Sequence, residues 1–239
     1  MIQDLRNRRP LIRILFAAII EITYAVFTRA WLSAQLAGVE LELAITALRL
    51  LTAGAYWLIF RDLILRRTSC PGAIRSPLVL IGVIFVLVIP FVFQGWDPGG
   101  GLLVSLIFAL TSVVVGLREE ILYRAVIFNL LEHRIGTFGT LLVSTALFVV
   151  YHYGALPFTP LVLTEVLCIS LILGLIYVKT GSLFIVILLH SAYDAVWFFG
   201  PYIEMPLPDN YRPAFLVPAL VLVFFGSWRF GTNKCSYSS

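Results

Sequence analysis

The sequence predicts an all-α protein, a polytopic membrane helical bundle of about eight transmembrane helices with the active site inside the bundle. Of its 239 residues, 60% are hydrophobic and only 13% are charged, whereas soluble domains carry about a quarter charged residues. Apolar runs also recur that are long enough to cross a hydrocarbon core of about 30 Å as helices. The mean hydropathy of +0.98 agrees with this class. We therefore expect residues 1–239 to form a single integral-membrane domain.

The apolar runs predict these helices in chain order at residues 11–28, 43–60, 77–93, 101–131, 137–153, 161–178, 183–200 and 214–228. The first run contains Glu21, and no small-residue cleavage site follows it. We therefore expect it to remain as a membrane helix and not to be removed as a signal peptide. The segment 28–42 has two interpretations, because it either extends the first helix or lies along the membrane interface.

Basic residues gather at alternate ends of the predicted helices. They lie before the first helix, in the connection 61–76, and in the connections that contain Arg134 and Lys179. The positive-inside rule assigns these segments to the cytoplasmic side, so both termini are expected in the cytoplasm. This topology accounts for the net charge of +4. The basic residues are therefore explained by a chain that lies among membrane lipids, and the charge gives no reason to expect a nucleic-acid partner.

The fourth and fifth predicted helices form a hairpin that predicts where two buried charges lie. The fourth helix has 31 residues without proline, from Gly101 to Leu131, and is about 46 Å long, so it tilts or projects beyond the bilayer core. The short turn 132–136 follows it. Residues equidistant from the turn of an antiparallel pair face each other. Glu119 and His152 should therefore stand at one level.

Two further ionisable residues, His190 and Asp194, lie one helical turn apart on the predicted helix 183–200. Together with Glu119 and His152 they are expected to converge inside the bundle. Ionisable side chains at membrane depth are costly and usually mark a pathway or a site. The sequence therefore predicts that these four residues form a functional site.

Three short motifs stand on three different predicted helices, in the order Glu119-Glu120-x-x-x-Arg124, Phe148-x-x-x-His152 and His190-x-x-x-Asp194. Together they resemble the three motifs of the CPBP family, which comprises the type II CAAX prenyl endopeptidases and their bacterial relatives in bacteriocin processing and abortive infection. The resemblance covers the core at residues 101–200. It implies an intramembrane glutamic endopeptidase that hydrolyses a peptide bond of a membrane-associated or lipidated protein or peptide substrate, with no cofactor and no metal.

The resemblance also implies a role for each residue of the site. Glu119 corresponds to the catalytic base, His152 to the residue that orients the attacking water, and His190 with Asp194 to the oxyanion site. These roles suit peptide hydrolysis, which needs a base that activates water and donors that stabilise an oxyanion. The bacterial relatives imply a location in the bacterial inner (cell) membrane.

Glu120, Arg124 and Phe148 are expected to support the site. Glu120 and Arg124 are spaced i, i+4, so they can pair along one helix face. Such a pair either serves the site or only holds helices together. Phe148 is expected to shape the wall of the cavity.

Asp194 departs from the asparagine that often ends the third motif of the family. An ionised carboxylate only accepts hydrogen bonds, so it cannot stabilise an oxyanion. Asp194 is therefore either protonated and a donor, or it orients the ring of His190 as an acceptor.

Two other functions would use the same four residues. A metal-dependent membrane protease would bind its ion with them, although the sequence has no HExxH helix and its three cysteines lack zinc-site spacing. A non-enzymatic transporter or scaffold would relay protons or bind a partner through them, although no internal repeat is evident. The remaining intramembrane charges, Glu21, Arg49 and Glu165, either pair with one another or line the cavity.

Overall fold

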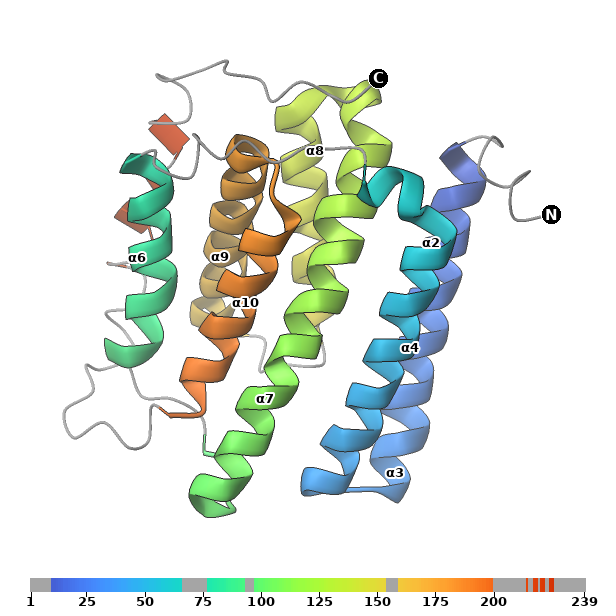
Figure 1. Ribbon diagram of the computed structural model, residues 1–239, viewed down its shortest axis with the longest axis vertical. Coiled ribbons are helices and arrows are strands. Elements are labelled where there is room, and N and C mark those ends of the chain that lie inside the picture. The colour runs from blue at the N-terminus through green and yellow to red at the C-terminus, as the bar shows by residue number, and fades with distance from the viewer. Residues whose placement is uncertain are drawn as a thin grey trace.

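The computed structural model describes residues 10–65, 77–92, 97–153 and 159–199, together with single positions between 214 and 225. The elements in these residues are all helices, which confirms the predicted all-α class. In chain order they are α2 (Pro10–Val26), η1 (Phe27–Leu32), α3 (Ser33–Gln35), α4 (Gly38–Ile64), α6 (Pro77–Val92), α7 (Gly101–Glu120), η2 (Ile121–Ile127), α8 (Phe128–His152), α9 (Pro160–Thr180) and α10 (Leu183–Trp197). Figure 1 shows a bundle with α6 at one edge and α2 with α4 at the other.

The first helical run is longer than predicted. α2, η1 and α3 follow one another without a break, so the run reaches Gln35. Leu36 and Ala37 then adopt extended backbone, and Gly38, with a φ of +57°, begins α4. Of the two interpretations of the segment 28–42, the structure therefore shows the extension of the first helix. The rest of the segment belongs to the next helix.

Among the residues that the structure describes, four helices are long and apolar enough to cross a membrane. They are Ile12–Gln35, Gly38–Ile64, Gly101–His152 and Pro160–Thr180. Val79–Val88 and Leu183–Trp197 are apolar but shorter. The expected number of about eight transmembrane helices is therefore not confirmed. The predicted helix 214–228 lies outside the described residues except at single positions.

The stretch Gly101–His152, which has 52 residues, contains the predicted hairpin. Its chain reverses at Gly136, at the end of the predicted turn, where φ is +72° and ψ is 169°. A positive φ is a conformation that glycine adopts without steric cost. The part of α8 after this residue returns beside η2 (Figure 1).

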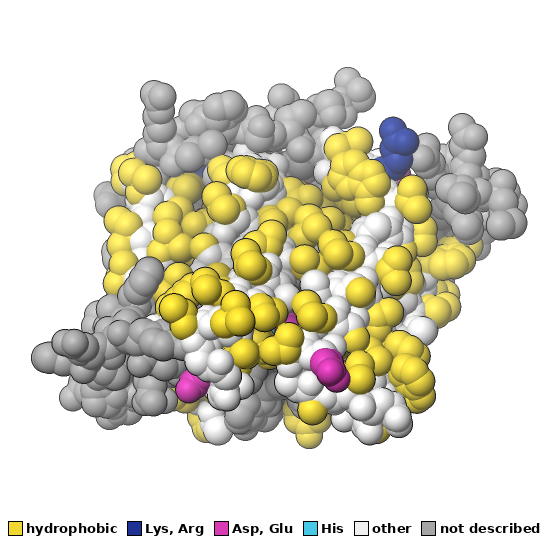
Figure 2. All heavy atoms as spheres, turned by 60° about the horizontal axis from the view of Figure 1, so that its bottom comes forward, with side chains coloured by type: hydrophobic (Ala, Val, Ile, Leu, Met, Phe, Trp, Pro, Cys, Tyr) yellow, Lys and Arg dark blue, Asp and Glu magenta, His cyan; other side chains and the backbone are white. Residues whose placement is uncertain are grey.

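The outward faces of the helices are apolar. Leu51, Leu103, Leu110 and Phe184 expose between 69% and 72% of their surface. Figure 2 shows hydrophobic side chains over most of the described part of one face, with isolated acidic and basic side chains among them. A protein in water rarely exposes so large an apolar surface, whereas lipid tails accommodate it. The chain is an integral membrane protein.

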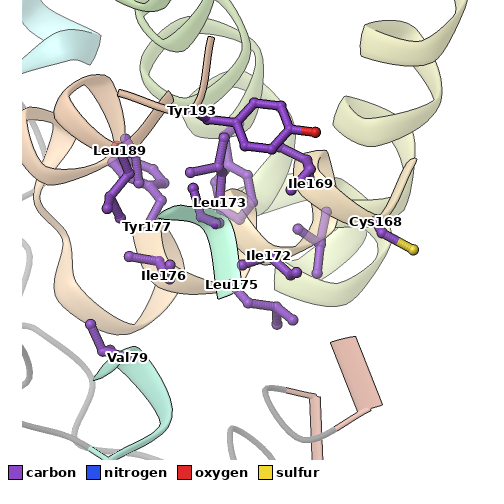
Figure 3. Close-up of a cluster of buried hydrophobic side chains, with 14 residues drawn as sticks. Val79, Cys168, Ile169, Ile172, Leu173, Leu175, Ile176, Tyr177, Leu189 and Tyr193 are labelled. Carbon is purple, nitrogen blue, oxygen red and sulfur yellow. The ribbon is translucent and has the colours of Figure 1, made fainter. Parts of the chain in front are cut away.

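Two buried apolar clusters hold the hairpin in place. One cluster joins α6, α9 and α10 around Ile172 and Leu173 (Figure 3), and Leu141 of α8 belongs to it. The other joins α2, α4, η2 and α8 and includes Tyr56 and Phe148. Because α8 contributes to both clusters, the hairpin of α7, η2 and α8 connects the two parts of the bundle.

Candidate active site

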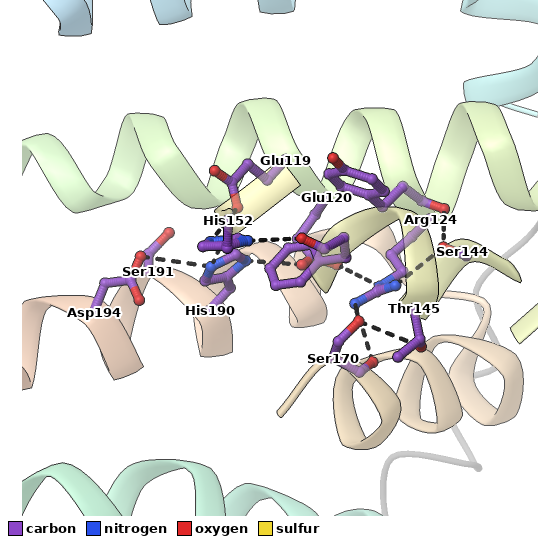
Figure 4. A network of polar contacts seen from close by, with 12 residues as sticks. Glu119, Glu120, Arg124, Ser144, Thr145, His152, Ser170, His190, Ser191 and Asp194 are labelled. Carbon is purple, nitrogen blue, oxygen red and sulfur yellow. Dashed lines mark hydrogen bonds and ion pairs between the residues drawn. The ribbon is translucent and has the colours of Figure 1, made fainter. Parts of the chain in front are cut away.

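Three helices bring the predicted ionisable residues together (Figure 4). α7 carries Glu119, the end of α8 carries His152, and α10 carries His190 and Asp194. The Oε2 atom of Glu119 lies 3.9 Å from Nε2 of His152 and 3.8 Å from Nε2 of His190. The Oδ2 atom of Asp194 lies 3.5 Å from the same nitrogen of His190. Glu119 and His152 therefore stand at one level, as the hairpin predicted.

A glycine permits the close approach of α7 and α10 next to these residues. A Cβ atom on Gly116 would lie 2.4 Å from Oγ and 3.0 Å from the backbone nitrogen of Ser191. Ser191 follows His190 directly in α10, and Gly116 lies one turn before Glu120 in α7. The missing side chain of Gly116 therefore lets α10 bring His190 within reach of both glutamates.

Glu120 orients the ring of His190. Its side chain is completely buried, and its Oε1 atom lies 2.8 Å from Nδ1 of His190. Because an ionised carboxylate can only accept, Nδ1 of His190 carries the proton and donates it to this hydrogen bond. The opposite ring nitrogen, Nε2, is thereby turned toward Glu119. Sequence reasoning missed this contact, because it depends on the register between α7 and α10.

Arg124 occupies the other oxygen of Glu120, which confirms the predicted pairing. Its Nε atom donates to Oε2 of Glu120 at 3.0 Å, and both side chains are fully buried. The two terminal nitrogens reach across to neighbouring helices, one to Oγ of Ser144 at 3.2 Å and the other to the carbonyl and hydroxyl of Ser170 at 3.0 and 3.1 Å. Arg124 therefore fixes Glu120 and connects η2, α8 and α9. Its position inside the π-helical turn η2 is typical of functional sites.

His152 is oriented by its own helix. Its Nδ1 atom lies 2.8 Å from the carbonyl oxygen of Phe148, one turn earlier. A carbonyl only accepts, so this nitrogen carries the proton and Nε2 faces Glu119. The Phe148 ring lies 4.5 Å from the His152 ring and 5.8 Å from the His190 ring, measured between centroids. Phe148 therefore packs against both imidazoles.

Glu119 differs from its neighbour Glu120 in the surroundings of its Oε2 atom. Its side chain is 6% exposed, and its Oε2 atom is buried without a hydrogen bond to any residue that the structure describes. Buried polar atoms are almost always hydrogen-bonded, so an orphaned one indicates strain, a bound water or a catalytic role. This oxygen is also the atom that faces the two imidazoles.

The three charges outside the motifs have other partners than the sequence suggested. The contacts pair Glu21 with Arg118 at 2.5 Å, Arg49 with Glu42 at 2.6 Å, and Glu165 with the hydroxyl of Tyr193. None of these contacts joins two of the three charges. Sequence reasoning missed Arg118, which is completely buried. Its one signal in the sequence is its place directly before Glu119 on an apolar helix.

The residues that the structure describes contain no group of three or more His, Cys, Asp or Glu side chains arranged to hold a metal ion. The four site residues approach one another through single atoms at 3.5 to 3.9 Å.

Comparison with protein families matches residues 101–196 to the type II CAAX prenyl endopeptidase Rce1-like family. The matched segment contains all three motifs and confirms the family resemblance that they carry. The family implies a membrane protease, a hydrolase whose substrates are membrane-associated proteins. Comparisons with curated proteins and with solved structures gave no match.

Proposed function

We propose that this protein is an intramembrane endopeptidase that hydrolyses a peptide bond of a membrane-associated or lipidated protein through glutamate-activated water. The observation that carries the proposal is the buried Oε2 atom of Glu119, which has no hydrogen-bond partner among the described residues and lies within 3.9 Å of two imidazole nitrogens. A water molecule between these atoms would hydrogen-bond to the carboxylate and to an imidazole at once.

In the proposed reaction Glu119 is the general base. It accepts a proton from the water while the water oxygen bonds to the carbon of the scissile carbonyl. The tetrahedral intermediate then collapses, the C–N bond breaks, and Glu119 returns the proton to the leaving nitrogen. His152 orients the water, because its Nδ1–H is committed to a carbonyl and its Nε2 lone pair is free to accept from the water.

His190 and Asp194 supply the oxyanion site in this proposal. Nε2 of His190 can donate only when the ring carries a second proton, and the buried Glu120 carboxylate behind the ring stabilises that positive charge. Glu120 already orients the ring through Nδ1, so Asp194 is not needed for orientation. We therefore favour a protonated Asp194 that donates a hydrogen bond to the oxyanion. One such donor typically contributes about 10² to 10³ in rate.

The proposal can be tested with the purified protein in proteoliposomes and a farnesylated peptide that ends in a CAAX sequence. We expect wild type to release the C-terminal tripeptide, identified by mass spectrometry, and Glu119→Gln to release none. The same peptide without the lipid shows whether lipidation is required. Comparison of membrane proteomes from cells that carry wild type or Glu119→Gln then reveals natural substrates. If neither experiment shows cleavage by wild type, the transporter or scaffold alternative takes precedence.

A location in the bacterial inner membrane with both termini in the cytoplasm remains part of this proposal. The orientation of the termini rests on the distribution of basic residues along the chain, and the bacterial inner membrane on the family resemblance of the three motifs.

A further inference from the structure

We propose that Arg118 is a positioning residue, through which the N-terminal helices α2 and α4 set the placement of Glu119 relative to His152. Both helices lie outside the matched segment 101–196, and no motif residue belongs to them. The inference rests on the proposed function, because it assigns Arg118 a role toward the proposed base and the water-orienting histidine.

Arg118 is completely buried and uses its guanidinium to join α7 to three other helices. Nε donates to the hydroxyl of Thr52 in α4 at 3.0 Å. One terminal nitrogen donates to the hydroxyl of Tyr151 in α8 at 3.1 Å, and the other to Glu21 in α2 at 2.5 Å. The ring of Tyr24 lies 3.9 Å from the guanidinium carbon. The planar fork of donors makes these contacts simultaneously, which a lysine cannot do.

Two of the residues in these contacts are direct neighbours of site residues in the chain. Arg118 directly precedes Glu119, and Tyr151 directly precedes His152. The ring of Tyr151 also stands edge-on to the ring of His152, with centroids 5.4 Å apart. The hydrogen bond between Arg118 and Tyr151 therefore joins α7 and α8 at the level where Glu119 and His152 face each other. A change in this bond changes the distance between them.

A second arginine, from η1, acts on the same end of α8. The terminal nitrogens of Arg29 donate to the carbonyl oxygens of Tyr151 and Tyr153, each at 2.6 Å. These carbonyls flank His152 at the helix end, where the last carbonyl groups lack partners within the helix. The N-terminal helices therefore hold α8 on both sides of His152, which Arg118 alone would not achieve.

The test uses two variants and a matched control. Arg118→Lys keeps the charge but loses the fork, and Tyr151→Phe removes only the hydroxyl. The control is Asp62→Asn, because Asp62 of α4 forms a 2.9 Å ion pair with Arg13 of α2. This ion pair joins the same two helices without reaching the site. A loss that reflects only a weaker contact between α2 and α4 would appear in the control as well.

The chain has three histidines, so nitrogen NMR of ¹⁵N-histidine-labelled protein reports the site without requiring activity. We expect Arg118→Lys and Tyr151→Phe to shift the ring signals of His152 and to leave those of His133 unchanged. With the farnesylated CAAX peptide we expect kcat to fall about 10- to 100-fold, because small misplacements of reacting groups cost up to about 10². KM should stay within about 2-fold of wild type, because misplaced reacting groups weaken the transition state more than the binding of the peptide. Asp62→Asn should resemble wild type in both measurements.

Histidine signals that stay at their wild-type positions in both variants would overturn the positioning role, and so would an unchanged kcat. Equal changes in kcat and in the histidine signals of Asp62→Asn would also overturn it, because they would show that Arg118 acts only through general helix packing. Failure of the proposed function is a separate result. It would appear as cleavage by Glu119→Gln or as no cleavage by wild type. The NMR comparison would still decide whether Arg118 and Tyr151 place His152.

Discussion

Nδ1 of His190 donates a 2.8 Å hydrogen bond to the fully buried carboxylate of Glu120, and this contact joins the first and third motifs inside the bundle. Glu120 thereby has two partners, because Arg124 binds its other oxygen at 3.0 Å. The two adjacent glutamates therefore have different surroundings. Each oxygen of Glu120 accepts a hydrogen bond, whereas the buried Oε2 atom of Glu119 has no hydrogen-bond partner among the described residues and is available for the reaction that we propose.

Glu120→Gln should lower both stability and activity. The amide is neutral, so Arg124 loses its counter-charge in a buried position, and breaking a buried pair in this way costs about 3–5 kcal/mol. His190 also loses the carboxylate that stabilises its positive charge in the mechanism that we propose. Thermal unfolding in detergent and the rate of peptide cleavage measure the two effects. Glu132→Gln, at a partly exposed carboxylate of α8, is the control and should change stability by less than about 0.5 kcal/mol. A Glu120→Gln protein as stable as wild type would show that the pair contributes little.

Gly116→Ala should separate α10 from α7 and reduce activity. The added Cβ would meet Ser191 at 2.4 Å from Oγ and 3.0 Å from the backbone nitrogen. Such overpacking typically costs about 1–3 kcal/mol. Gly54→Ala is a matched control, because a Cβ there meets no atom within 4 Å, and alanine in a helix is favoured over glycine by about 1 kcal/mol. We expect cleavage to fall at least 10-fold in the first variant and to remain unchanged in the second. Equal activity in both variants would mean that the site tolerates a wider spacing of the helices.

Chelators should leave the purified enzyme active. In the mechanism that we propose, a carboxylate activates the water directly, so no step requires an ion. Cleavage of the farnesylated peptide is measured before and after treatment with EDTA and with 1,10-phenanthroline. Loss of activity that added zinc restores would favour the metal-dependent protease, with Glu119, His152, His190 and Asp194 as ligands.

Asp194→Asn should keep activity and flatten its dependence on pH. An amide donates a hydrogen bond at every pH, whereas a carboxylic acid donates only while it is protonated. Asp194→Ala, which has no donor, should be slower by about 10²-fold. Rates of all three proteins across the pH range separate the two roles. If Asp194→Asn is folded but inactive at every pH, Asp194 acts as a carboxylate and the donor role is wrong.

The sequence predicts those parts of the site that follow from one helix or one turn. The pairing of Glu120 with Arg124 follows from i, i+4 spacing, and the level of Glu119 with His152 follows from counting outward from the turn at Gly136. Both are found in the structure. These relations need no knowledge of how distant helices pack.

Contacts between helices that are distant in sequence could not be predicted. The bond of His190 to Glu120 requires the rotation and register of α10 on α7, which Gly116 and Ser191 determine through their close approach. The network around Arg118 requires the placement of α2 and α4. Apolar patterning predicts that such helices are in the membrane, but not which of their faces meet.

The described residues do not confirm the expected number of transmembrane helices. Apolar runs gave about eight spans, whereas length and composition in the described residues support four. Gly101–His152 is one reason for the difference, because this stretch counts as one helix although its chain reverses at Gly136.

The most direct test of the proposed mechanism is the activity of Glu119→Gln in proteoliposomes. Glutamine has the same shape and no charge, so expression, membrane insertion and thermal unfolding should match wild type, but it cannot accept a proton from water. We predict no detectable release of the C-terminal tripeptide from the farnesylated CAAX peptide. A folded Glu119→Gln protein that retains even a tenth of the wild-type turnover would contradict the assignment of Glu119 as the base.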